Sequence, residues 1–207
     1  LKATGYEWWI KRLYFSMKRF DYVRLDHFRS FSAYYAIPQG KTALEGTWQK
    51  GGGPGFFRAV REALGTVGII AEDLGALDND VFNLICLLGY PGMNVWQFSD
   101  KEMQAMSPEK AKTRVFYSGT HDNQTLVSWC KDTDYALTPD EIIKELLSGD
   151  CPWVILQLQD VLSLDDRARL NIPGTPSGNW SWRCPKPLLT TGVARQHCRL
   201  VSEAGRL

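Results

Sequence analysis

The sequence predicts an α/β fold built on parallel strands, and two observations support this prediction. Short apolar runs of strand length alternate along the chain with segments whose apolar residues recur every three or four positions. Strands separated by helices pair in parallel, because the helical crossover returns the chain to the same end of the sheet. An α/β barrel and an open doubly wound sheet both satisfy this pattern. Since no linker or repeat interrupts the 207 residues, we expect one domain.

The first half of the chain predicts two strands, two further helices and a loop after an opening helix. Residues 5–20 place Tyr6, Trp9 and Leu13 at helical spacing, which indicates an amphipathic helix. Gly89 is expected to end the last helix of this half. The other elements, in order, are strand Tyr22–Leu25, the glycine-rich loop Thr47–Gly55, helix 56–64, strand Val67–Ile70 and helix Asn79–Leu88.

The second half continues the alternation of strands and helices. The apolar run Trp153–Leu158 is assigned as a strand, although its periodicity also permits a helix. The charges of LDDRAR (164–169) are interpreted as a solvated helix face. The remaining elements are strands Met93–Phe98 and Arg114–Ser118 and helices Gln124–Lys131 and Pro139–Leu147.

Composition excludes several classes of protein. The chain is 44% hydrophobic and 23% charged with a net charge of +1, which is typical of a globular protein and gives no reason to expect nucleic-acid binding. No apolar stretch approaches the roughly 20 residues that a membrane span requires. The five cysteines are widely spaced and odd in number, so neither a disulfide framework nor a zinc site is expected. We expect no metal and no cofactor.

Acidic residues follow three of the predicted strands. Asp26 follows the first, Glu72 and Asp73 the second, and His121 and Asp122 the fourth. The carboxyl ends of parallel strands lie on one face, where barrel enzymes place their active sites. The alternative is structural: an acid can pair with a neighbouring cation or cap the helix that follows.

Converging carboxylates suit the cleavage of glycosidic bonds. Neighbouring acids shift each other's pKa, so that one carboxyl can act as an acid while the other stays ionised. Glycosidases use such a pair. Abundant tryptophans also fit a sugar ligand, although core packing is an alternative for each of them. Those in or beside predicted loops are Trp48, Trp96, Trp180 and Trp182.

Six motifs resemble one enzyme family and occur in its order. The segment RLDHFRSFSAYYAIP, which begins at Arg24, resembles the R-I-D-H-F-R-G-F-x-A-Y-W-x-I-P segment of the amylomaltases, the 4-α-glucanotransferases of glycoside hydrolase family 77. The others are TWQKGGGPGFF, IIAEDLGAL, YPGMNVWQF, SGTHDN and NIPGTPSGNWSWR. The resemblance covers Tyr6 to about Leu189. Two residues depart from the pattern: Ser30 replaces a glycine, and Trp96 replaces an aliphatic residue, which is expected to reshape the pocket.

The resemblance implies a (β/α)₈ TIM barrel, of which this chain would supply about strands 4 to 8. Such barrels usually need about 250 residues, so residues 1–207 are expected to form the C-terminal portion of the catalytic barrel, with the N-terminal strands on a further part of the same enzyme.

The resemblance also assigns roles to individual residues. Asp26 would be the nucleophile, Glu72 the acid/base and Asp122 the stabiliser of the transition state. Retention would require the carboxyls of Asp26 and Glu72 to lie about 5–5.5 Å apart. The implied substrate-binding residues are Arg24, His121, Trp48, Phe98 and Asn171.

By this resemblance the enzyme would transfer segments between α-1,4-glucan donors and acceptors through a covalent glucosyl-enzyme. Hydrolysis of the same bond and an inactive glucan-binding fragment are the alternatives. Neither a nucleic acid nor a membrane is an expected partner. The expected location is the cytoplasm, or the plastid in a plant or alga.

Overall fold

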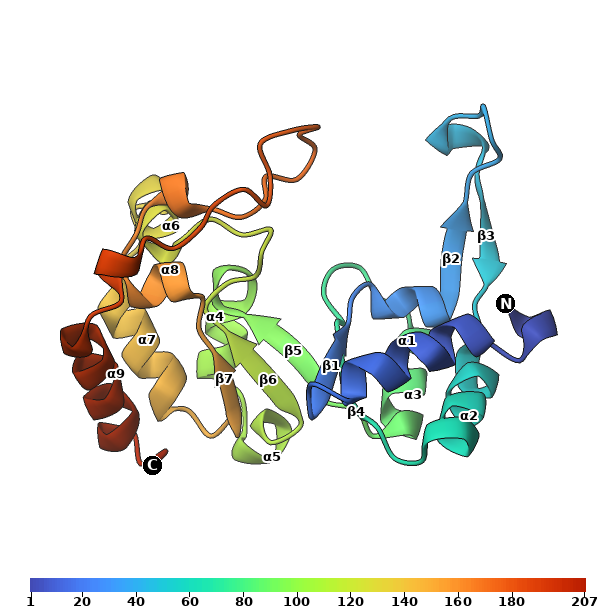
Figure 1. The fold of residues 1–207 in the computed structure, drawn as a ribbon, viewed down its shortest axis with the longest axis horizontal. Coiled ribbons are helices and arrows are strands. Elements are labelled where there is room, and N and C mark those ends of the chain that lie inside the picture. Colours follow the sequence, from blue (N-terminus) through green and yellow to red (C-terminus); the bar gives the residue numbers. More distant parts are fainter. The chain divides into compact units, whose positions relative to one another are not determined.

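The computed structural model describes residues 1–207 and has an α/β fold with parallel strand pairs. Two compact units divide the chain, Leu1–Met93 and Asn94–Leu207, and each is described by itself (Figure 1). None of the helices has the length and apolar character needed to cross a bilayer. The prediction of a single barrel domain stays a prediction.

The first unit contains two strand pairs. Strands β1 and β4 pair in parallel, whereas β2 and β3 form an antiparallel ribbon that extends away from the helices of this unit (Figure 1). Its strands are β1 (Tyr22–Leu25), β2 (Ala33–Ala36), β3 (Thr47–Lys50) and β4 (Gly68–Ala71). Its helices are α1 (Glu7–Met17), α2 (Gly53–Leu64) and α3 (Asn79–Leu88), with short 3₁₀ helices at Lys2–Thr4, Phe28–Phe31 and Ala43–Glu45.

Aromatic packing forms the core of the first unit. Phe56 and Phe57 on α2 are almost fully buried, and the ring of Phe31 stacks on that of Phe56 with 4.9 Å between centroids. Helix α3 begins where the Asp78 side chain accepts a hydrogen bond from Val81 N and ends at Gly89, whose φ of 66° is left-handed. The predicted bounds of this helix are confirmed.

The second unit is organised around the sheet of β5, β6 and β7, in that order. Strands β6 and β7 pair in parallel, and Val115 pairs with Trp153. The strands are β5 (Gly92–Val95, which begins in the first unit), β6 (Arg114–Tyr117) and β7 (Trp153–Ile155). The helices are α4 (Trp96–Gln104), α5 (Pro108–Ala111), α6 (Leu126–Thr133), α7 (Pro139–Ser148), α8 (Leu158–Val161) and α9 (Thr191–Glu203), with 3₁₀ helices at Asp166–Ala168 and Lys186–Leu188.

Three predicted boundaries are wrong. Strand β5 ends at Val95, and Trp96 opens α4 as a core residue that is 2% exposed. Strand β7 ends at Ile155, before the turn of α8. The loop predicted at Thr47–Gly55 instead contains β3 and the start of α2. All four residues of β3 are exposed, so the strand carries no burial pattern by which it could be predicted.

Candidate active site

The first unit brings Asp26 and Glu72 to one edge of a parallel strand pair. Leu25 at the end of β1 pairs with Ala71 at the end of β4, and the two acids are the next residues along each strand. Glu72 N donates to Leu25 O over 3.1 Å, which continues the ladder by one residue. The expectation that these strand ends gather acids is therefore confirmed within this unit.

Backbone groups hold the carboxylate of Glu72. Its Oε2 accepts from His27 N over 2.7 Å, and its Oε1 accepts from Leu74 N over 2.9 Å. His27 has a left-handed φ of 49°, which turns the chain directly after Asp26. Because neither donor is a mobile side chain, the orientation of the Glu72 carboxylate depends on the strand ends themselves.

Arg24 lies two residues before Asp26 on the same strand edge. Its Nη1 is 2.8 Å from Asp26 Oδ1, and its Nε is 3.2 Å from Met93 Sδ. The Asp26 side chain is 65% exposed, so it is accessible to a ligand. Asp26 therefore has the neighbouring cation that the structural alternative requires, and the same contact leaves it exposed at the strand edge.

Asp73 does not cap a helix. Its Oδ1 accepts a hydrogen bond from Met93 N over 2.8 Å, which ties the end of β4 to the start of β5. Asp78 caps α3 instead. The helix-capping alternative is wrong for Asp73, because a contact 20 residues away takes its carboxylate.

Trp48 lies on β3 and is 55% exposed. The guanidinium of Arg29 lies over its ring at 4.4 Å, and Tyr35 of β2 packs against its edge. Arg29 Nη2 is in turn 2.9 Å from Asp78 Oδ2. The predicted sugar-stacking residue therefore has one face on a cation–π contact.

The second unit brings together His121, Asp122 and Asn171. Asn171 Nδ2 donates to Asp122 Oδ1 over 2.5 Å, and Asn171 N donates to His121 O over 3.1 Å. His121 Nε2 is 3.5 Å from Asp122 Oδ2. The structure therefore brings together three predicted site residues from segments about 50 positions apart in the sequence.

Arg169 is a residue of this group that the sequence did not indicate. Its Nη2 donates to Asp122 O over 2.5 Å, and its Nε donates to Asn171 O over 2.9 Å. The interpretation of LDDRAR as a solvated helix face is wrong for Arg169, because long-range contacts hold its guanidinium. It holds for Arg167, whose side chain is 92% exposed.

Trp180 adds an aromatic surface beside His121. Their ring centroids are 5.1 Å apart with an interplanar angle of 32°, and Trp180 is 54% exposed. Asn179 closes the preceding loop, because its Oδ1 accepts from Ile172 N over 2.9 Å. Such an exposed ring beside polar groups suits the face of a sugar.

Phe98 and Trp96 differ from their predicted surroundings. Phe98 lies on α4 rather than at the end of a strand, and it is 66% exposed. Trp96 packs into the core of the second unit. We expected Trp96 to reshape a substrate pocket, but in the structure it packs in the core.

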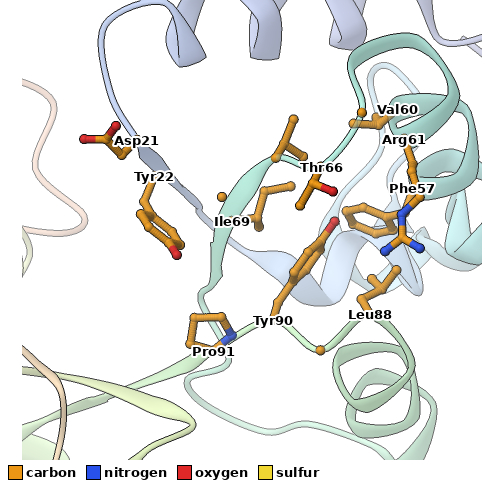
Figure 2. Close-up of a pocket in the computed structure, with 14 residues that line it drawn as sticks. Asp21, Tyr22, Phe57, Val60, Arg61, Thr66, Ile69, Leu88, Tyr90 and Pro91 are labelled. Carbon is orange, nitrogen blue, oxygen red and sulfur yellow. The ribbon is translucent and has the colours of Figure 1, made fainter.

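A pocket of about 310 Å³ lies at the opposite ends of β1 and β4, where these strands begin (Figure 2). Asp21, Arg61 and Tyr90 are among its lining residues. Burial raises the pKa of the Tyr90 hydroxyl. Because this lining contains a single carboxylate and none of the predicted site residues, it does not offer the acid pair that glycosidic chemistry needs.

The fold and the strand-terminal carboxylates define the chain as an α/β protein with two acids next to each other at one edge of a parallel strand pair. A sequence model of the family described as 4-alpha-glucanotransferase matches residues 1–190. The chain therefore belongs to the 4-alpha-glucanotransferase family, glycoside hydrolase family 77.

Named relatives agree with this membership. The 4-alpha-glucanotransferase of Streptococcus pneumoniae is 40% identical over 213 residues, which cover 93% of this chain and 42% of the relative. The chloroplastic/amyloplastic 4-alpha-glucanotransferase of Solanum tuberosum is 37% identical over 204 residues, covering 89% of this chain and 35% of the relative. The chain thus spans less than half the length of these relatives.

A solved structure agrees as well. The amylomaltase from Streptococcus agalactiae in complex with acarbose superposes with a TM-score of 0.87 at 31% identity, over 99% of this chain and 46% of that one. The amylomaltase of Corynebacterium glutamicum, at 16% identity and a TM-score of 0.67, shares the fold.

Proposed function

We propose that the chain supplies the catalytic residues of a 4-α-glucanotransferase that works by double displacement with retention. Asp26 attacks the anomeric carbon of the donor while Glu72 protonates the departing 4-oxygen. Glu72 then takes the proton of an incoming glucan hydroxyl, which displaces Asp26 and restores the α-linkage. Bond and proton counts are unchanged after the two steps.

The observation that carries this proposal is the link between the two acids at the ends of β1 and β4. Glu72 is held by the backbone of the residue that follows Asp26, so the two carboxyl groups share one rigid strand edge. A carboxyl separation of about 5–5.5 Å is the corresponding prediction for a retaining enzyme.

The residues of the second unit would bind the donor sugar. Asp122 would bind ring hydroxyls at the cleavage point, with His121 and Asn171 beside it. Arg24 would orient Asp26, and the exposed rings of Trp48 and Phe98 would contact glucan.

The wider architecture belongs to the same proposal. Residues 1–207 would form the C-terminal portion of a (β/α)₈ barrel, about strands 4 to 8, and the remainder of the enzyme would complete it. The donor and acceptor would be α-1,4-glucans. The location would be the cytoplasm, or the plastid if the source is a plant or alga, as in the name of the potato relative.

A chimaera tests the proposal, in which this chain replaces the matching segment of the Streptococcus pneumoniae relative. Incubated with maltotriose, it should yield glucose together with maltopentaose and longer chains, and Asp26→Asn should abolish these products. Glucose and maltose alone would indicate hydrolysis. Transfer that survives Asp26→Asn, or a folded chimaera without transfer, would contradict the proposal.

The 207-residue chain by itself should have little or no glucan-transfer activity. Placement errors near 1 Å can cost about a hundredfold in rate, and the relatives are more than twice as long. Robust turnover by the chain alone would contradict this expectation.

A further inference from the structure

The second unit contains a completely buried carboxylate outside the candidate site. Asp160 on α8 has 0% exposure. Its Oδ2 accepts from Ser118 Oγ over 2.6 Å, and its Oδ1 accepts from Leu126 N over 2.8 Å. Burying a charged group costs free energy unless the group is hydrogen-bonded, and these two hydrogen bonds offset that cost for Asp160.

The two donors to Asp160 are the two ends of the loop that carries His121 and Asp122. Ser118 follows the last residue of β6, and Leu126 is the first residue of α6. We name residues 118–126 the Asp122 loop. The Asp160 carboxylate therefore joins the two ends of the loop, because one of its oxygens bonds to Ser118 and the other to Leu126.

Further contacts fasten the first end of the loop to the sheet. Ser118 N donates to Ile155 O over 3.2 Å, and Ser118 Oγ accepts from Gln157 N over 3.1 Å. The serine backbone thus bonds to β7, and its hydroxyl links Gln157, the residue before α8, to Asp160. Since α8 follows β7 after two residues, Asp160 is placed by the same sheet that places the loop.

The interior of the loop is also ordered by side chains. Asn123 is 6% exposed, and its Oδ1 accepts from Thr120 N over 2.9 Å and from Thr120 Oγ1 over 2.7 Å. Its Nδ2 donates to Gln97 Oε1 over 3.3 Å. The exposed Asp122 thus lies within a tight turn that runs from Thr120 to Asn123.

We propose that Asp160 is a positioning residue, which fixes the Asp122 loop by holding both of its ends with one carboxylate. The catalytic importance of the Asp122 loop rests on the proposed function. The contacts of Asp160 with Ser118 and Leu126, which we call the clamp, do not depend on that function. The competing explanation is a purely local one, in which Asp160 only satisfies the first N–H of α6 and contributes to general stability.

Two substitutions of Asp160, to asparagine and to alanine, differ in the hydrogen bonds that they keep. Asparagine can keep both contacts, although the one to Ser118 reverses: Oδ1 accepts from Leu126 N, and Nδ2 donates to Ser118 Oγ, which no longer donates to position 160. Alanine removes both. Ser118→Ala is a gentler variant, because it detaches only one end of the loop and removes one buried oxygen.

The readout is the imidazole of His121, which stacks on Trp180 and is one of only three histidines in the chain. The ring current of Trp180 shifts its proton resonances, and His121→Gln assigns them. Hydrogen exchange of the Leu126 amide reports the other end of the loop. Neither measurement involves a glucan, so failure of the proposed function and failure of the clamp are distinguishable.

The experiment compares four variants of the 207-residue chain by NMR: Asp160→Ala, Asp160→Asn, Ser118→Ala and the control Met103→Ala. Met103 is a core residue of the same unit, 6% exposed on α4. Each variant is measured at the same number of degrees below its own Tm, which removes differences in overall stability.

Asp160→Ala should move the His121 resonances and speed exchange at Leu126 by about tenfold or more, because the amide loses its acceptor. Ser118→Ala should move His121 in the same direction, and it decides the question if Asp160→Ala does not fold. Asp160→Asn and Met103→Ala should leave the His121 resonances unshifted. The proposal is overturned if His121 stays unmoved in Asp160→Ala and Ser118→Ala, or if Met103→Ala moves it equally.

Discussion

The carboxylate of Glu72 accepts a hydrogen bond from the backbone N–H of His27, with 2.7 Å between Glu72 Oε2 and His27 N. His27 is the residue after Asp26, and it adopts a left-handed φ of 49°. The turn after β1 and the acid after β4 are therefore held together by one contact. In the proposed mechanism this contact orients the acid/base from the backbone next to the nucleophile.

Glu72→Gln should slow transfer strongly while preserving the fold. The Glu72 carboxylate accepts from two backbone N–H groups, those of His27 and Leu74, and glutamine has only one acceptor oxygen for them. The N–H that loses its acceptor should lower the free energy of unfolding by about 1–3 kcal/mol. A missing general acid should cost about 10²- to 10⁴-fold in rate. Maltotriose transfer by the chimaera and thermal unfolding followed by circular dichroism measure the two effects.

A donor that needs no protonation provides the control for Glu72→Gln. Fluoride leaves a glycosyl carbon without protonation by an acid, so a maltosyl fluoride donor should restore formation of a covalent maltosyl-enzyme on Asp26 in this variant. If the variant is equally slow with maltotriose and the fluoride, Glu72 acts in some way other than as the acid.

Arg24→Lys should reduce transfer by about tenfold or more with little effect on stability. Arg24 uses Nη1 for Asp26 and Nε for Met93, and the single ammonium of lysine cannot reproduce this fork. Because Asp26 is 65% exposed, the ion pair itself contributes at most about 1 kcal/mol to the free energy of unfolding. A lysine variant of the chimaera with unchanged kcat for maltotriose would exclude an orienting role.

The first residues of the strands could be predicted from the sequence better than the last residues. Apolar runs located β1, β4 and β6 within a residue or two, because buried parallel strands are continuous in apolar residues. The apolar run 93–98 passes from strand to helix at Trp96, and periodicity over so short a segment does not distinguish the two. Strand β3 is exposed throughout, and β2 is partly buried only at its two end residues, so neither strand has the alternating burial of a half-buried strand.

The acids of the candidate site could be predicted because parallel pairing aligns the residues that follow each strand. Their partners could not. Arg169 reaches Asp122 across 47 positions, and Asp160 reaches Ser118 across 42. No local pattern encodes such contacts. One signal for Asp160 was present, a single carboxylate within the otherwise uncharged segment LQLQDVL, where burial requires a partner.

The stability of the chain should depend on the protonation of Asp160. Burial, the largest cause, raises the pKa of this carboxyl from its ordinary 3.8 to about 6, and the nearby Asp166 adds to the rise. The hydrogen bonds from Ser118 and Leu126 lower the pKa and so limit the shift. Since the folded chain binds this proton more tightly, the stabilisation is full below pH 3.8 and is lost as pH rises through 6.

Asp160→Asn should remove this dependence on pH. The wild-type free energy of unfolding minus that of Asp160→Asn should fall by about 2 kcal/mol between pH 4 and pH 7, because a shift of about two pKa units is worth about 3 kcal/mol and part of this is already lost at pH 4. Urea unfolding of both proteins at several pH values measures the difference, in which the other titrating groups cancel. A difference that stays flat or rises with pH would contradict the raised pKa.

Gly119→Ala should destabilise the second unit through a single side chain. A Cβ at this position would lie closer than van der Waals contact to Nε2 of Gln157, and it would also meet the Asn123 Cβ at 3.4 Å. Overpacking of this kind typically costs about 1–3 kcal/mol. Gln157 Nε2 is buried and has no hydrogen-bond partner, so no hydrogen bond of this amide group opposes its displacement.

The double variant Gly119→Ala with Gln157→Ala decides which part of the structure yields to the new methyl group. If Gln157 is the obstacle, its removal frees the space, and the double variant should regain at least about 1 kcal/mol relative to the sum of the single changes. Urea unfolding of the four proteins measures this coupling. Additive losses would mean that the Asp122 loop itself shifts, and His121 should then move as well, because Gly119 lies two residues before it on that loop.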